Sequence, residues 1–369
     1  MRFDAGQASP PAAPMTSRSG NLFFVDLVKV FAAQLIILHH LAFYGPMSDL
    51  AAPLAPNLMA WLSEHGRMAV QAFLVVGGFL AARSLAPDGA ATFTNLLIVA
   101  RKRYQRLLPP LIAALLICIA CSAVARAWMT HDSIPAAPTW LQVAAHLVLL
   151  QDILGVDALS AGVWYVAIDF QLYVLLAGLL WLGRRIGGSP LFAPRMTLLL
   201  VIASLYNFNL EQGWDSWALY FAGAYGLGAL AYWSLREQDW LERLAVLIVV
   251  TGIALEVEFR ERIAVALAVA VLLIVAMRPR ALAITGRMAR TRLGQAITWL
   301  SVRSYPVFLV HFAVCLLVNA LFVRLDIEAP LFNLAGMGLA WLASNAAGAA
   351  LHATLAWLPR QRAAHAGAT

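Results

Sequence analysis

Long apolar runs, interrupted by isolated polar residues, make up most of the chain. About 20 consecutive apolar residues are needed to cross a bilayer as a helix, and by that measure the pattern predicts ten spans. Those at 196–210, 241–256 and 262–277 are short or ambiguous. The full set is 22–44, 67–86, 107–128, 162–183, 196–210, 216–234, 241–256, 262–277, 297–323 and 332–358. The predicted fold class is therefore all-α, a polytopic membrane protein.

Basic residues gather in every second connection between these spans. The connections 129–161 and 211–215 contain no Lys or Arg, whereas those after the second, fourth, sixth and eighth spans are basic. Because basic loops stay on the cytoplasmic side, we expect those four connections, and with them both termini, to be cytoplasmic.

The ends of the chain are predicted from composition. Residues 1–20 are rich in Pro, Ala and Ser and are expected to form a disordered cytoplasmic leader. Residues 21–358 then form one transmembrane domain, and residues 359–369 a short basic cytoplasmic tail.

Overall composition supports a membrane protein. Hydrophobic residues make up 62% of the chain and charged residues 12%, against roughly a quarter charged in soluble domains. The formal charge of +7 would suggest nucleic acid in a soluble protein, but here it is explained by basic cytoplasmic loops. Cys118, Cys121 and Cys315 lie in apolar runs without metal-ligand spacing, so we expect free thiols and no metal site.

The first expected span contains four ionisable residues: Asp26, Lys29, His39 and His40. Eleven steps of 100° bring His40 to within roughly 20° of Lys29, and Asp26 lies roughly 40° from His40, so these three share a face. Ionisable residues inside a span usually face a bundle interior or a wet cavity. The alternative is a boundary ion pair of Asp26 with Lys29 and an interfacial pair of histidines.

The fourth span has Asp169 and Gln171 inside it, with Trp164 and Tyr173 nearby. Asp169 is expected at a depth similar to that of His40, where a carboxylate can orient an imidazole that acts as a general base. A purely packing role for Asp169 is the alternative.

Three further groups of residues stand out. Arg103 and Arg106 lie three residues apart at the cytoplasmic end of the third span, a spacing that suits a phosphate, although membrane anchoring also explains them. Tyr305 and His311 lie in the ninth span, where a lone histidine is as often a helix–helix hydrogen bond as a site. Gly77 and Gly78 indicate close helix packing or a narrow substrate channel.

Together these stretches resemble the family-3 membrane acyltransferases, ten-span proteins that O-acylate cell-surface carbohydrates and some small molecules. The family's first-span pattern Asp-x-x-Arg-x10-His is matched by Asp26, Lys29 and His40, and its Ser-Gly-Phe by Gly77-Gly78-Phe79. The third-span pattern Arg-x-x-Arg before prolines is matched at Arg103 and Arg106. The Trp-Ser-Leu-x-x-Glu-x-Gln-Phe-Tyr and Ser-Tyr-x-x-Tyr-Leu-x-His patterns are matched at Trp164, Asp169, Gln171, Tyr173, Ser304, Tyr305 and His311.

Three positions depart from the family patterns. Lys29 replaces Arg and loses the bidentate fork, Asp169 replaces Glu and shortens the reach of the carboxylate, and Gly77 replaces Ser and loses a hydroxyl.

The resemblance implies an enzyme that moves an acyl group, most simply acetyl, from cytoplasmic acyl-CoA to a hydroxyl of an extracytoplasmic or lipid-linked carbohydrate. Lys29, Arg103 and Arg106 would hold the donor phosphates. His40 would act as general base or transient acyl carrier, with Asp169 stabilising its imidazolium. No permanently bound cofactor is implied, and the expected location is the bacterial inner membrane.

Two other classes of function fit parts of the sequence. A proton-coupled transporter would use His40 and Asp169 as proton carriers. A passive membrane scaffold would leave the spaced polar residues without a purpose.

Overall fold

The computed structural model describes residues 22–235 and 239–366, with side chains described as far as Trp357. Only helices occur within these residues, which confirms the all-α prediction. The expected leader, residues 1–20, lies outside the described part. Each expected span corresponds to a helix: α1 (Phe23–Phe43), α4 (Ala69–Leu85), α5 (Leu96–Trp128), α7 (Val163–Arg185), α8 (Phe192–Tyr206), α9 (Ala218–Ser234), α10 (Trp240–Val257), α11 (Glu261–Ala276), α13 (Arg292–Arg324) and α14 (Pro330–Ala366).

Short helices occupy several of the connections. They are α2 (Pro46–Ala51), η2 (Ala52–Leu54), α3 (Pro56–His65), η3 (Gly66–Met68), α6 (Trp140–Leu147), η4 (Phe208–Leu210), η5 (Gln212–Trp214) and α12 (Pro279–Met288). The helix α3 runs through η3 into α4, so this apolar stretch begins before the expected span at 67–86 and covers Pro56–Leu85.

Six stretches of the described chain are long and apolar enough to cross a bilayer, and α11 with α12, bent by 91°, makes a possible seventh. The helices α8, α9 and α11 have only 15, 17 and 16 residues, and α10 contains Glu242, Arg243 and Glu256. The protein is therefore a multi-pass membrane protein with six or seven candidate spans. The count of ten is not confirmed, and the cytoplasmic position of the termini stays a prediction.

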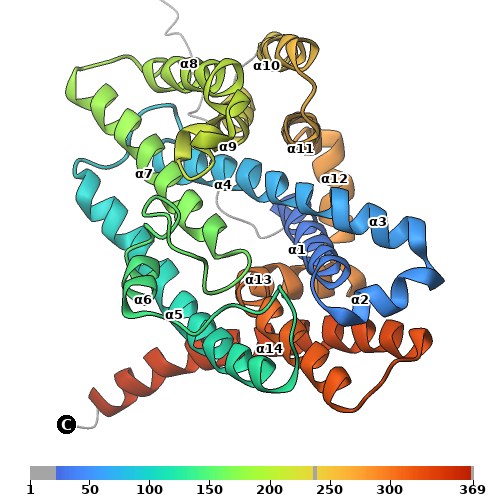
Figure 1. The fold of residues 1–369 in the computed structure, drawn as a ribbon. Helices are drawn as coiled ribbons and strands as arrows, with labels where there is room; N and C mark the ends of the chain where they lie inside the picture. Colours follow the sequence, from blue (N-terminus) through green and yellow to red (C-terminus); the bar gives the residue numbers. More distant parts are fainter. Residues whose placement is uncertain (1–21, 236–238, 367–369) are drawn as a thin grey trace, which may run out of the picture.

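Two groups of helices meet at the centre of the molecule. In one, α13 packs along α14, α5 and α1; in the other, α4 packs along α9, which also contacts α8 and α11. Figure 1 shows α1 and α4 between α8 and α9 on one side and α13 and α14 on the other. Several of the polar residues singled out in the sequence line a cavity at this junction of α1, α4, α5, α7 and α13: Lys29, Arg103, Arg106, Asp169 and Tyr305.

Close backbone contact joins α4 to α9. A Cβ atom at Gly78 would lie 1.8 Å from the backbone oxygen of Tyr225, and one at Gly228 would lie 1.9 Å from that of Val75. Any side chain at either position would therefore collide with backbone, which cannot swing aside. This contact confirms the close-packing interpretation for Gly78.

The connection from α5 to α7 is held by hydrogen bonds of the buried His146 side chain. The His146 imidazole donates from Nδ1 to the Gln142 oxygen, 2.7 Å away, and accepts at Nε2 from the Leu159 nitrogen, 3.1 Å away. Burial lowers the pKa of His146, which favours the neutral form that this acceptor role requires. The connection ends at Gly162, which begins α7 with a φ of 90° that suits glycine.

Replacing Gly78 by alanine should prevent α4 and α9 from closing together. We expect Gly78→Ala and Gly228→Ala each to lower the free energy of unfolding by ~1–3 kcal/mol or more, the range typical of overpacking. The measurement is the unfolding temperature of the detergent-solubilised protein, which should fall. The control is Gly252→Ala in α10, where an added Cβ meets nothing within 4 Å. There the lower backbone entropy of alanine should leave stability unchanged or slightly raised. Equal behaviour of all three variants would contradict the close contact.

Candidate active site

Three cavities follow one another along α1. The basic cavity, about 570 Å³, is lined by Leu22, Arg83, Lys102, Arg103, Arg106 and Tyr173 among others. The central cavity, about 240 Å³, is lined by Lys29, Asp169, Ser304 and Tyr305 among others. The histidine cavity, about 750 Å³, is lined by His39, His40 and Tyr44 among others. Leu22 and Tyr44 flank the two ends of α1, whose 21 residues span about 32 Å, so the far ends of the basic and histidine cavities lie about a bilayer thickness apart.

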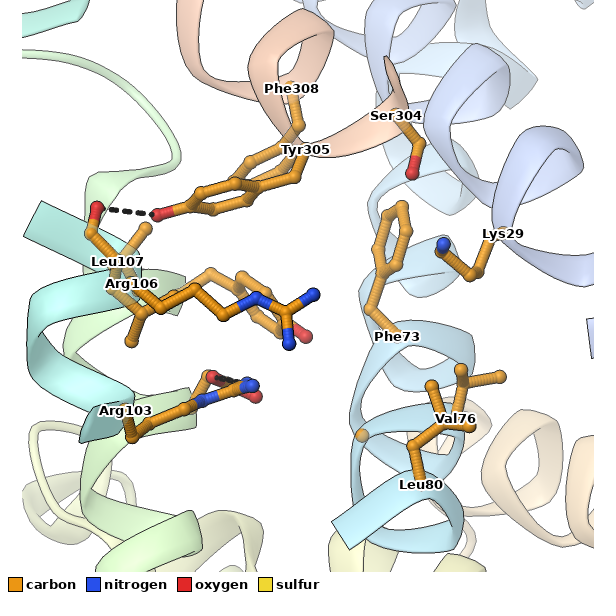
Figure 2. A pocket seen from close by; sticks show the side chains of 14 residues that line it. Lys29, Phe73, Val76, Leu80, Arg103, Arg106, Leu107, Ser304, Tyr305 and Phe308 are labelled. Atoms are coloured by element: carbon orange, nitrogen blue, oxygen red, sulfur yellow. Dashed lines mark hydrogen bonds and ion pairs between the residues drawn. The ribbon is translucent and has the colours of Figure 1, made fainter. Parts of the chain in front are cut away.

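The basic cavity adjoins the central cavity. Arg103, Arg106, Gly77 and Leu80 line both of them. Figure 2 shows the Arg106 side chain extending from α5 into the central cavity, toward the side on which Lys29 and Phe73 lie. Among the described residues no hydrogen bond or ion pair to Arg106 is found, so its guanidinium is available to an anion.

Arg103 has a different neighbour. Its Nη2 atom forms an ion pair with Oδ2 of Asp169, and its guanidinium lies over the Tyr173 ring, 5.0 Å from the centroid. The side chains are 25% and 6% exposed, respectively. The sequence placed Asp169 beside His40, whereas here the packing of α7 on α5 turns the carboxylate toward Arg103. Asp169 therefore neutralises a half-buried cation, and Arg103 is less free than Arg106 to hold a phosphate.

Lys29 and Asp26 are joined through α13. The Lys29 ammonium donates to both the backbone oxygen and the hydroxyl of Ser301, each 3.1 Å away, and the Ser301 hydroxyl donates to Asp26, 2.6 Å away. No direct ion pair between Asp26 and Lys29 is found in the described structure. The lysine also lines the central cavity, so it is held at the wall of the path that the shared helical face predicted.

His40 is in contact with His311, which the fold brings from α13. The His311 ring has Nδ1 at 2.6 Å from the Phe308 backbone oxygen, and because a carbonyl can only accept, this nitrogen carries the hydrogen. In neutral His311, Nε2 is then an acceptor, and it lies 2.5 Å from Nδ1 of His40. His40 must therefore carry its hydrogen on Nδ1, which leaves the lone pair of Nε2 free.

This relay gives His40 the form of a general base. A proton taken up at Nε2 leaves the Nδ1–H···His311 hydrogen bond intact, so the imidazolium keeps its partner. The His40 ring lines the histidine cavity and is 8% exposed. His311 thus occupies the orienting position that the sequence analysis gave to Asp169.

His39 lines the same cavity but is anchored differently. Its Nδ1 atom donates to the Leu62 backbone oxygen of α3, 2.9 Å away, and its ring centroid lies 5.0 Å from that of His40. Gly66, one helical turn after Leu62, leaves room for the His39 side chain, since a Cβ at Gly66 would lie 2.8 Å from the His39 Cβ. The two histidines therefore contact different helices, as their difference in helical phase predicted.

The other predicted site residues are divided among several places. Trp164 lines the histidine cavity, Tyr173 the basic cavity and Tyr305 the central cavity, where its hydroxyl donates to the Leu107 oxygen, 3.3 Å away. Gln171 instead accepts from the Ala218 nitrogen at the start of α9, 3.0 Å away. It does not line any of the three cavities, so the structure gives it a contact that supports the helix packing.

Sequence reasoning missed several residues of the cavity walls. Arg67 and Arg262 add positive charge to the histidine cavity, and Phe308 lines both it and the central cavity. Outside the cavity walls, Ser301 was also missed; it lies three residues before Ser304 in α13 and so shares its helical face, and this spacing was the signal available in the sequence. Nothing local marks Phe308 among the many apolar residues of its span.

The fold and these cavities define a multi-pass membrane protein with basic side chains lining a cavity at one end of a path and a histidine with a free ring nitrogen at the other. The acyltransferase-domain family, family 3, matches residues 22–348 of the chain. The chain belongs to this family and is an acyltransferase, as the resemblance of its motifs predicted. No curated protein and no solved structure matches it.

The ion pair between Arg103 and Asp169 should couple their contributions to stability. Removing one partner of a buried pair leaves an uncompensated charge, which typically costs about 3–5 kcal/mol. Because Arg103 is partly exposed, we expect the cost for this pair to lie toward the lower end of that range. We expect Asp169→Asn and Arg103→Gln each to lower the unfolding temperature, and the double variant to recover much of the loss. Additive losses in the double variant would show that the two charges act independently.

Proposed function

We propose that this acyltransferase moves an acyl group, most simply acetyl, from acyl-CoA bound at the basic cavity to a hydroxyl group bound in the histidine cavity. The acceptor is a carbohydrate, either extracytoplasmic or lipid-linked, and the protein acts in the bacterial inner membrane. The observation that carries this proposal is the relay from Phe308 through His311 to His40, which leaves one imidazole nitrogen free at the wall of a large polar cavity.

The basic cavity suits the donor. Arg83, Lys102 and Arg106 line it, and guanidinium groups bind phosphate oxygens through charge-assisted, bidentate hydrogen bonds. The adenosine phosphates of acyl-CoA would be held there, and the pantetheine arm would extend into the central cavity past Lys29 and Arg106. Arg103, because of its ion pair with Asp169, would shape this passage rather than grip the phosphates.

The histidine cavity suits a sugar. Its volume of about 750 Å³ lies within the usual range for a ligand site. Trp164 and Phe221 supply aromatic faces, with ring centroids 5.5 Å apart. Glu64, Gln71 and Asp215 supply hydrogen-bonding groups. Aromatic and polar groups in combination match the apolar faces and hydroxyl edges of a carbohydrate.

During the transfer, one proton passes from the acceptor hydroxyl through His40 to the leaving thiolate. The acceptor hydroxyl gives its proton to Nε2 of His40 as its oxygen attacks the thioester carbonyl. The new C–O bond forms, the C–S bond breaks, and the thiolate takes the proton from the imidazolium to leave as CoA thiol. His311 holds the His40 ring throughout by accepting from its Nδ1–H.

The direct test is incubation of the purified protein with radiolabelled acetyl-CoA and candidate glycans. We expect release of CoA that depends on the acceptor, together with transfer of label to the glycan. Substrate movement that collapses with the proton gradient, without CoA release, would instead support the proton-coupled transporter.

Replacing His40 should separate chemistry from binding. We expect His40→Ala to lower the rate of acyl transfer by about 10²–10⁴-fold, the usual effect of losing a general base, while acyl-CoA still binds. His39→Ala, which removes the same ring from the neighbouring position, should keep measurable activity. The comparison requires equal expression of both variants. If His39→Ala is inactive and His40→Ala is active, the relay does not serve the reaction.

Replacing Arg106 should affect the donor alone. We expect Arg106→Gln to raise the KM for acyl-CoA several-fold while the KM for the acceptor changes little, and added salt to mimic this in the unmodified protein. The matched control is Arg195→Gln, a basic residue that lines a separate cavity between α8, α9 and α10. Equal rises for both substrates would assign Arg106 to membrane anchoring.

A further inference from the structure

Three aromatic rings separate the central cavity from the histidine cavity. Phe73 of α4, Tyr165 of α7 and Phe308 of α13 have ring centroids 5.8, 5.9 and 5.5 Å apart, so each ring touches the other two. All three line the central cavity. Of the described residues that line these two cavities, Phe308 alone belongs to both. These three residues are called the aromatic septum below.

The septum lies across the route between the two substrates. Val70 and Gln71 of α4 and Trp164 of α7 line the histidine cavity. Phe73 and Tyr165, which follow them along the same two helices, line the central cavity. The basic and central cavities share four wall residues, so they adjoin on the donor side of the septum. An acyl group that enters from the basic cavity therefore meets the three rings before it meets His40.

Phe308 is the member of the septum placed to move. Its ring packs against Gly162, where a Cβ would lie 3.1 Å from the ring tip, and its centroid lies 5.8 Å from that of His311. The backbone oxygen of the same residue accepts the hydrogen bond from His311. Pro306 lies two residues earlier within α13, where the missing N–H removes one helical hydrogen bond. The ring thus lies beside the histidine relay, in a part of α13 with a weaker backbone ladder.

We propose that the aromatic septum is a gate that seals the donor side from the acceptor side and restricts the donor to short acyl groups. In this proposal, which rests on the proposed function, the Phe308 ring swings aside to let the thioester reach the hydroxyl activated by His40. Only a short acyl chain finds room beside Phe73 and Tyr165. The closed septum keeps water in the histidine cavity from reaching the thioester, which prevents hydrolysis of acyl-CoA.

The seal is tested without relying on catalysis. Three serines line the successive cavities: Ser84 the basic, Ser304 the central and Ser63 the histidine cavity. Each is replaced singly by cysteine in a protein in which the native Cys118, Cys121 and Cys315, all free thiols, have been changed to alanine. The protein is reconstituted in sealed vesicles, and a membrane-impermeant thiol reagent is added on the face from which Ser63→Cys reacts.

We expect Ser304→Cys to react slowly from that face while Phe308 is present, and at least tenfold faster with Phe308→Ala. Ser84→Cys should stay unreactive from that face while Phe308 is present. Phe308→Tyr should keep the seal, and Phe322→Ala, the same substitution in the same helix at a residue packed against Gly336, should not open it. Fast reaction of Ser304→Cys with Phe308 in place, or no acceleration by Phe308→Ala, would overturn the gate.

The selectivity is tested with acetyl-, butanoyl- and hexanoyl-CoA. One methylene in an apolar pocket typically changes a rate by about 10–200-fold, so we expect Phe308→Ala to raise the butanoyl-to-acetyl ratio of kcat/KM at least tenfold. It should also raise hydrolysis of acetyl-CoA in the absence of acceptor. Unchanged selectivity and hydrolysis would overturn the proposed restriction. No transfer by the unmodified protein, together with gated labelling, would contradict the proposed function and leave the septum standing as a seal.

Discussion

Every ionisable group buried in this bundle needs a partner, and the placement of those partners determines how the helices meet. An ionisable residue in a span costs about 2.5–3.5 kcal/mol on insertion scales, and the cost is reduced only if the group is paired or faces water. Asp169 pairs with Arg103 and so joins α7 to α5. The hydrogen bonds of Lys29 and Asp26 to Ser301, and of His40 to His311, join α1 to α13 at two levels.

Two polar groups that these pairings leave without a partner face cavities. Arg106 extends into the shared space of the basic and central cavities, and Nε2 of His40 is the ring atom that its relay leaves free. Arg106 belongs to α5 and His40 to α1, so the two groups come from different helices. A membrane enzyme with substrates on opposite faces needs such an arrangement, because binding groups at both ends must meet the reacting atoms in between.

The departures from the family patterns have partly structural explanations. A Cβ at Gly77 would lie 3.0 Å from a ring carbon of Tyr225 and 3.3 Å from Oδ1 of Asp169, so the usual serine would be crowded here. Glycine at 77 and the Tyr225 ring therefore fit together beside the Arg103 pair. Lysine at 29 donates to two oxygens of Ser301, a contact that a compact ammonium makes without the planar fork of arginine.

The sequence by itself determined the helical class, the positions of the helices and the shared face of Asp26, Lys29 and His40, because these follow from apolar runs and a fixed rotation per residue. It also predicted the family, since five motifs occur in order. Only the tertiary structure decided which helices are neighbours. That choice gave His40 the partner His311 instead of Asp169, turned Gln171 toward α9, and brought Phe73, Tyr165 and Phe308 together from three helices. Such pairings depend on packing between helices far apart in the sequence, and the spacing of residues within one helix does not indicate which other helix it contacts.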